Sequence, residues 1–213
     1  RRSASARRLV TGVNRGRLIV FEGVDGSGKS TQLRLLAAWL RESQIAHLVT
    51  KEPTDGRWGR KIRAMARAGE RIAPEEELRW FVEDRREHVA AVLRPGLAAG
   101  QIVLSDRYYL STVAYQGARG LDPQTLLAQA EAEFPLPDLA LLFELDPDAG
   151  LARVQARGDA AEPSFEEAGF LARVAAVFRA LDRPYLARID ASGPIETVAR
   201  AVRETVRERL AIH

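Results

Sequence analysis

One stretch of the chain carries the residue types and spacing that bind the phosphates of a nucleotide. It reads Gly23-Val-Asp-Gly-Ser-Gly-Lys-Ser30 and fits G-x-x-x-x-G-K-[ST] at every specified position. Glycines let successive backbone N–H groups point at a phosphate, and the helix expected to follow adds its positive end. Lys29 then reaches the β- and γ-phosphates, and Ser30 coordinates Mg²⁺. The loop predicts binding of a nucleoside triphosphate with magnesium and leaves the phosphate acceptor open.

Further candidates follow a short apolar run near the middle of the chain. Asp106 is interpreted as a second Mg²⁺ residue beside Ser30, or as a partner of Lys29, with a helix cap as the alternative. Arg107 is predicted to bridge donor and acceptor phosphates, because phosphoryl transfer needs positioning and positive charge more than covalent catalysis. A surface salt bridge is the alternative for Arg107. The residues predicted to bind ATP are Gly23, Val24, Asp25, Gly26, Ser27, Gly28, Lys29, Ser30 and Thr31.

Phe81 and Arg85 lie one helical turn apart in a segment predicted to be helical, so they share a face. The Phe81 ring could stack on a nucleobase, with the charge of Arg85 on the same side of the helix. The alternative is a core phenylalanine beside an exposed arginine. Arg63 and Arg67 are expected to be solvated charges, and the three histidines show no metal-ligand spacing.

Short apolar runs alternate with helical segments along the chain. The predicted strands are residues 18–21, 47–50, 102–104, 139–145 and 188–190, and the predicted helices are 31–41, 60–67, 74–93, 123–133, a segment from 147, 170–186 and 194–210. We expect the helix at 74–93 to end before Pro95. The alternation predicts an α/β fold with a doubly wound, parallel, five-stranded sheet and helices on both faces. Ligands of such sheets bind outside the carboxyl ends of the strands, where the candidate residues fall.

The composition is that of an ordinary globular protein. The chain has 213 residues, 46% of them hydrophobic and 29% charged, enough for one domain with its own core. The lack of cysteine excludes disulfides, thiolate zinc sites and a cysteine nucleophile. The longest strongly apolar stretch, residues 139–143, is far shorter than the roughly 20 residues of a membrane span. With no signal peptide visible, we expect a cytoplasmic protein without a membrane partner.

The basic residues are almost all arginine, which raises the isoelectric point to about 9.6 although the net charge is only +3. A high isoelectric point is typical of nucleic-acid binding. Because 29 acidic residues are interspersed with the basic ones, we expect no nucleic-acid partner. Residues 1–16 have no acid and no apolar periodicity and are predicted to be a flexible basic arm. Residues 17–213 are predicted to form a single domain.

Several short motifs occur in a fixed order along the chain. They are residues 21–31 (FEGVDGSGKST), 81–85 (FVEDR), 106–108 (DRY), 111–117 (STVAYQG), 137–139 (PDL) and 150–158 (GLARVQARG). In this order and spacing the chain resembles the thymidylate kinase family of P-loop nucleoside monophosphate kinases. The resemblance runs from about residue 17 to about residue 186. Each motif is weak alone, but the ordered set is specific.

The resemblance implies Mg²⁺- and ATP-dependent phosphorylation of dTMP to dTDP by a homodimer. It implies that Arg85 and Gln116 read the thymine edge and that Tyr115 crowds the deoxyribose. It also implies that Asp25 contacts the acceptor phosphate or the Mg²⁺ shell, where the sequence alone equally allows a turn residue. The residues implied to bind dTMP are Asp25, Lys51, Phe81, Arg85, Arg107, Ser111, Tyr115 and Gln116.

Three departures from the family pattern remove positive charge or change its geometry. Lys51 stands where the family has arginine and loses bidentate phosphate binding. Gly26 stands where one branch has a loop arginine, and Glu162 where the lid often has its second arginine. A kinase for another pyrimidine nucleotide and a nucleotide-binding paralogue with little turnover therefore stay as alternatives. The predicted catalytic cations are Lys29, Arg107 and, from a short lid at about residues 153–169, Arg153 and Arg157.

Overall fold

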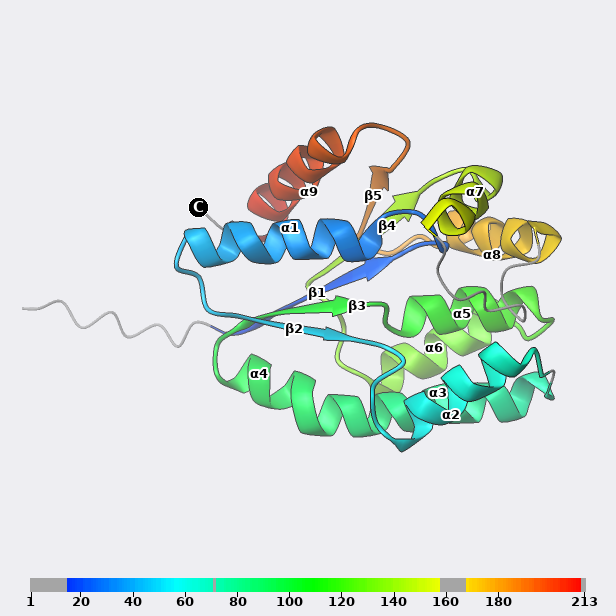
Figure 1. The fold of residues 1–213 in the computed structure, drawn as a ribbon. Coiled ribbons are helices and arrows are strands. Elements are labelled where there is room, and N and C mark those ends of the chain that lie inside the picture. The colour runs from blue at the N-terminus through cyan, green and yellow to red at the C-terminus, as the bar shows by residue number, and fades with distance from the viewer. Residues whose placement is uncertain (1–14, 71, 158–167, 212–213) are drawn as a thin grey trace, which may run out of the picture.

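A central parallel sheet organises the chain (Figure 1). The computed structural model describes residues 15–70, 72–157 and 168–211. The strands lie in the order β2-β3-β1-β4-β5. Their bounds are β1 (Arg17–Glu22), β2 (His47–Lys51), β3 (Ile102–Asp106), β4 (Leu139–Glu144) and β5 (Leu186–Asp190). The strand that leads into the phosphate-binding loop is therefore the central one.

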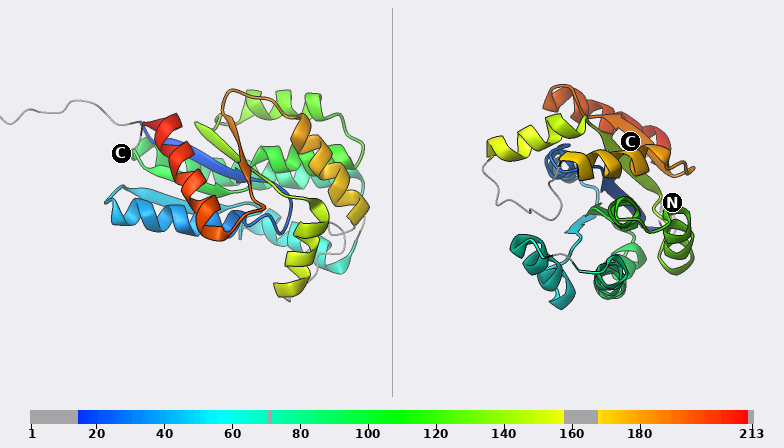
Figure 2. Two further views of the ribbon diagram at one scale, coloured as in Figure 1. Left: turned by 90° about the horizontal axis from the view of Figure 1, so that it is seen from above. Right: turned by 90° about the vertical axis from the view of Figure 1, so that its right-hand side faces the viewer.

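Helices cover both faces of this sheet (Figures 1 and 2). α1 (Lys29–Glu42) and α9 (Ile195–Leu210) pack their leucine and valine side chains on one face. α7 (Pro147–Arg157) follows β4. A separate hydrophobic core, distinct from the one that α1 and α9 form, includes side chains of five other helices. They are α2 (Arg57–Ala68), α3 (Pro74–His88), α5 (Tyr109–Ala118), α6 (Pro123–Glu133) and α8 (Ala168–Ala180). The predicted doubly wound α/β fold with five parallel strands is confirmed.

The register of the central strands brings the candidate residues to one edge. Residues 18–21 of β1 are fully buried, as expected for an apolar run in a sheet covered on both faces. Phe21 pairs with Asp106 of β3, and Lys51 of β2 pairs with Asp106 from the other side. The carboxyl ends of three strands therefore meet where the phosphate-binding loop begins.

The predicted end of the helix at residues 74–93 is wrong. The helical backbone continues from α3 through a π-helical turn, η1 (Val89–Leu93), into α4 (Arg94–Ala98), which contains Pro95. A proline inside a regular α-helix lacks its N–H and its ring clashes with the carbonyl four residues before it. The wider π-turn directly before Pro95 offers relief from that clash, so the helical backbone continues to Ala98 instead of stopping.

Other boundaries shift by a few residues. The helix predicted at 170–186 ends at Ala180, because Pro184 precedes β5 and the strand takes up Leu186. α5 was not predicted, since Tyr109–Gln116 are all buried, including the polar Ser111, Thr112 and Gln116, and the segment shows no separate apolar and polar faces. Within the described residues, no helix is long and apolar enough to cross a membrane. The predicted basic arm lies almost wholly outside the described residues and, like the single-domain assignment, stays a prediction.

Candidate active site

The phosphate-binding loop links β1 to α1 through backbone conformations that favour glycine. Gly23, Gly26 and Gly28 have φ angles of 138°, 79° and 89°. Gly28 caps α1, so the N–H groups of the first helical turn face the loop, as the sequence predicts. A hollow of about 170 Å³ opens over the loop. Six of the nine predicted ATP-binding residues line it: Asp25, Gly26, Gly28, Lys29, Ser30 and Thr31.

Gly26 is held against the backbone of α7. A Cβ at this position would lie 2.0 Å from the carbonyl oxygen of Gly150. We expect Gly26→Ala to lower the melting temperature by at least about 5 °C, because overpacking and a left-handed φ each cost about 1–3 kcal/mol. Gly169→Ala, in α8 with nothing within 4 Å of its Cβ, is the matched control and should not lower it. Thermal unfolding without nucleotide checks both variants, and equal melting temperatures would contradict the contact.

Lys29 and Ser30 are positioned by the loop and by β3. Lys29 is buried, and its Nζ donates to Val24 O at 2.8 Å. Burial and the nearby charge of Arg107 lower the pKa of Lys29 to about 8. Ser30 Oγ donates to Asp106 Oδ2 at 2.5 Å. A hydroxyl and one carboxylate at a phosphate site suit Mg²⁺, which takes few protein oxygens and completes its shell with phosphates and water.

Arg107 joins the loop to a second cavity. Its Nη1 donates to Gly23 O at 3.2 Å and to Ser111 Oγ at 2.9 Å, and its Nη2 donates to the carboxylate of Asp25. Tyr115 OH donates to the other oxygen of Asp25 at 2.9 Å. Partial burial opposes ionisation of Asp25, but Arg107 and Lys29 outweigh it and lower the pKa of that carboxyl to about 2. The guanidinium is thus fixed from three sides.

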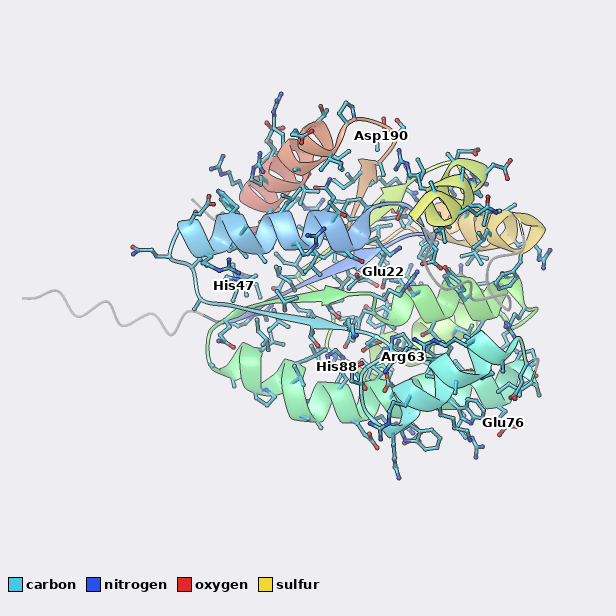
Figure 3. The ribbon with its side chains drawn as sticks, in the orientation of Figure 1. Glu22, His47, Arg63, Glu76, His88 and Asp190 are labelled. Atoms are coloured by element: carbon cyan, nitrogen blue, oxygen red, sulfur yellow. The ribbon has the colours of Figure 1, made fainter. Side chains whose placement is uncertain are left out.

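Glu22 supports the same arginine from inside the protein and was missed by the sequence analysis as a site residue. It lies at the carboxyl end of β1 (Figure 3) and is fully buried. Its carboxylate accepts from Tyr108 N at 2.9 Å and from Ser111 Oγ at 2.5 Å. Burial raises the pKa of Glu22 to about 7. The sequence did contain a signal for this role, because Glu22 directly follows the four apolar residues of a predicted buried strand.

The second cavity, of about 250 Å³, lies beside the loop between α2, α3 and α5. Its wall combines apolar groups with cations, as a nucleotide site requires. Seven of the eight residues implied to bind dTMP line it: Asp25, Lys51, Phe81, Arg85, Arg107, Ser111 and Tyr115. Arg85 is 2% exposed, and its Nε and Nη2 donate to Glu52 Oε2 at 2.9 and 2.7 Å. The alternative of an exposed arginine at position 85 is therefore wrong.

Comparison with known proteins agrees with this geometry. A family model described as thymidylate kinase matches residues 21–202. The chain belongs to the thymidylate kinase family. It is 44% identical over 199 residues to a thymidylate kinase of Akkermansia muciniphila, covering 93% of this chain and 95% of the relative. A thymidylate kinase of Desulfotalea psychrophila is 42% identical over 92% of this chain and 97% of its own length. One of Xanthomonas campestris pv. campestris (strain B100) is 46% identical over 92% and 85%.

One implied thymidylate kinase residue does not reach the cavity wall. Gln116 is fully buried, and its Nε2 donates to Glu77 Oε1 at 2.9 Å. Glu77 also pairs with Arg119 at 2.7 Å. Gln116 is not among the residues that line the cavity, so its contact with the thymine edge stays a prediction.

Arg63 is a lining residue that the sequence analysis assigned to solvent. It projects from α2 (Figure 3), and its Nη1 donates to Pro53 O at 2.9 Å while its Nη2 pairs with Asp55 at 3.0 Å. Lys51 Nζ lies 3.3 Å from the same carboxylate. Arg67, by contrast, is exposed as expected. No pattern in the sequence separates Arg63 from its basic neighbours, because the difference arises when α2 packs beside the loop after β2.

The predicted lid arginines are only partly described. Arg153, on α7, donates from Nη1 to Ala191 O at 3.2 Å and from Nη2 to Ser192 O at 3.5 Å. It therefore contacts the loop after β5. Arg157 ends α7, and its side chain, together with Gly158, Glu162 and most of the lid, lies outside the described residues. The catalytic roles of both arginines stay predictions.

Proposed function

We propose that this protein transfers the γ-phosphoryl group of Mg²⁺-bound ATP to dTMP, giving dTDP and ADP. The observation that carries the proposal is that the hollow over the phosphate-binding loop and the second cavity share wall residues. Both are lined by Asp25, Lys51, Glu52 and Arg107. A donor in one and an acceptor in the other would have their phosphates on either side of the Arg107 guanidinium. The family membership names thymidylate as the acceptor.

The roles of the residues follow from their positions. Lys29 binds the β- and γ-phosphates of ATP, and Ser30 with Asp106 holds Mg²⁺. When bound, Mg²⁺ neutralises charge on the transferring phosphoryl group. Arg107 spans the two phosphates, and little covalent chemistry is left for the protein to perform.

The residues of the cavity wall select the acceptor nucleotide by its shape and its charge. Lys51 and Arg63 at its wall supply positive charge for the acceptor phosphate, and both now share the carboxylate of Asp55. Phe81 offers a ring for stacking on the base, with Arg85 beside it. Tyr115 OH is held by Asp25, and the family resemblance supports a role for this ring in crowding a ribose 2′-hydroxyl. Lys51 keeps the positive charge of the arginine that the family has at this position. We therefore favour an active kinase over a paralogue that binds nucleotide with little turnover.

The base-reading role of Arg85 is tested by Arg85→Ala. We expect the KM for dTMP to rise by about tenfold or more while the KM for ATP changes little, since a lost charge-assisted hydrogen bond costs about 1.5–3 kcal/mol. Arg86→Ala is the matched control, because the neighbouring arginine is exposed and pairs with Glu83 and Glu133. Steady-state kinetics with a coupled ADP assay measure the KM for dTMP and the KM for ATP in each variant. Equal weakening toward both substrates would count against the role.

The same assay over the nucleoside monophosphates separates the remaining candidates. Robust phosphorylation of another pyrimidine nucleotide with dTMP inert would favour the first alternative. ATP binding without product over hours would favour a paralogue with little turnover. The family resemblance also supports a homodimer and a cytoplasmic location, for which light scattering and cell fractionation are the respective tests.

A further inference from the structure

The carboxylate of Glu52 is shared between Arg85 and a histidine that the proposed reaction does not use. Glu52 is buried in the loop after β2, and both contacts of Arg85 fall on one of its oxygens, Oε2. The other oxygen, Oε1, lies 2.9 Å from His88 Nδ1. Burial alone would raise the pKa of Glu52, but Arg85 and His88 outweigh it and hold that pKa below its ordinary value. Each partner thus has its own carboxylate oxygen.

His88 is fixed at both ring nitrogens. It is 3% exposed and lies at the end of α3, between that helix and β2 (Figure 3). Because an ionised carboxylate only accepts hydrogen bonds, His88 Nδ1 carries the proton and donates to Glu52. His88 Nε2 lies 2.7 Å from Thr50 Oγ1, which belongs to β2. The imidazole ring therefore cannot turn without breaking its buried hydrogen bond to Glu52 or its partly buried one to Thr50.

The arrangement leaves part of Arg85 for a ligand. Arg85 Nη2 also donates to Thr112 Oγ1 at 2.9 Å, so Nε and Nη2 are both engaged. Among the described residues, Arg85 Nη1 makes no hydrogen bond. If His88 were removed, Glu52 Oε1 would be a buried acceptor without its donor, a costly state. The carboxylate would then turn to take further N–H groups from the guanidinium, and Arg85 would leave the orientation that faces the cavity.

We propose that His88 is a positioning residue for the acceptor nucleotide, holding Arg85 in place through Glu52. The inference rests on the proposed function, because Arg85 is its base-reading group. The competing explanation is that His88 only joins β2 to α3. A purely structural role would lower the melting temperature and affect both substrates alike, whereas positioning would act on the acceptor alone.

The test compares four variants in the coupled assay with ATP and dTMP, with melting temperatures measured in parallel. His88→Leu removes both hydrogen bonds, and we expect the KM for dTMP to rise by about tenfold with the KM for ATP within about twofold of wild type. His88→Asn keeps an N–H donor near the position of Nδ1 and should restore the KM for dTMP to within about threefold. Thr50→Val removes only the outer hydrogen bond and should give a smaller rise than His88→Leu.

His47→Leu is the matched control. His47 lies at the other end of β2 (Figure 3), and its Nδ1 lies 2.9 Å from Ile45 O, away from Glu52 and Arg85. We expect no change in either KM. The inference is overturned if active His88→Leu enzyme keeps the wild-type KM for dTMP, or if both KM values rise together. Should His88→Leu fail to fold, a wild-type KM in Thr50→Val together with a large rise in His88→Asn overturns it. A wild-type enzyme that leaves dTMP unphosphorylated overturns the proposed function and this inference with it.

Discussion

Replacing Lys29 with alanine is expected to lower turnover by about 100-fold or more. The ammonium is buried under the loop, where in the proposed function its charge would act in a low dielectric on the phosphoryl oxygens, which gain charge during transfer. Because that interaction is stronger in the transition state than in the bound substrate, kcat should fall further than the affinity for ATP. Single-turnover phosphoryl transfer and ATP titration measure the two effects separately.

Lys61→Ala is the matched control for Lys29→Ala. Lys61 is exposed on α2, with its Nζ 3.7 Å from the centre of the Trp80 ring, so it takes part in a surface contact and in no phosphate site. We expect its turnover to equal that of wild type. If Lys29→Ala keeps more than about a tenth of the wild-type rate, the assignment of the loop to the donor phosphates is contradicted.

The features that were predictable from the sequence are those that short segments determine. The glycines at 23, 26 and 28 have to take left-handed backbone conformations, so their spacing already encodes the loop. The buried run at residues 18–21 fixes the central strand, and Asp106 and Arg107 follow a strand whose end must lie beside the loop. Local pattern and fold rules together therefore predict the position of the phosphate-binding loop and of Asp106 and Arg107 beside it.

The rest of the site depends on contacts between distant segments, which no local pattern shows. Arg63 and Arg67 look alike in the sequence, and only the loop after β2 makes one of them a cavity residue. Gln116 belongs to a family motif, yet its side-chain amide donates a hydrogen bond to Glu77, which lies 39 residues away in the sequence. The continuation of α3 past Pro95 depends on a π-turn, for which the sequence has no simple signal.

Arg107→Ala should have the second large effect, a fall in turnover of about 100-fold or more with a smaller loss of affinity for either nucleotide. Three supports hold this guanidinium: Asp25 at the loop, Ser111 on α5, and the carbonyl of Gly23. Because the group is held before substrate arrives, little reorganisation is required when negative charge develops between the two phosphates. The loss should therefore appear mainly in kcat.

Two further variants make the assignment of Arg107 specific. Arg107→Lys keeps a positive charge but cannot contact Asp25, Ser111 and the phosphates at once, so it should recover only a small part of the lost rate. Arg183→Ala removes an arginine that pairs with Glu131 at 2.8 Å, does not line either cavity, and should leave kcat unchanged. Full turnover in Arg107→Lys would show that a diffuse charge suffices. Turnover of Arg107→Ala within about twofold of wild type would mean that the two phosphates do not meet at this residue.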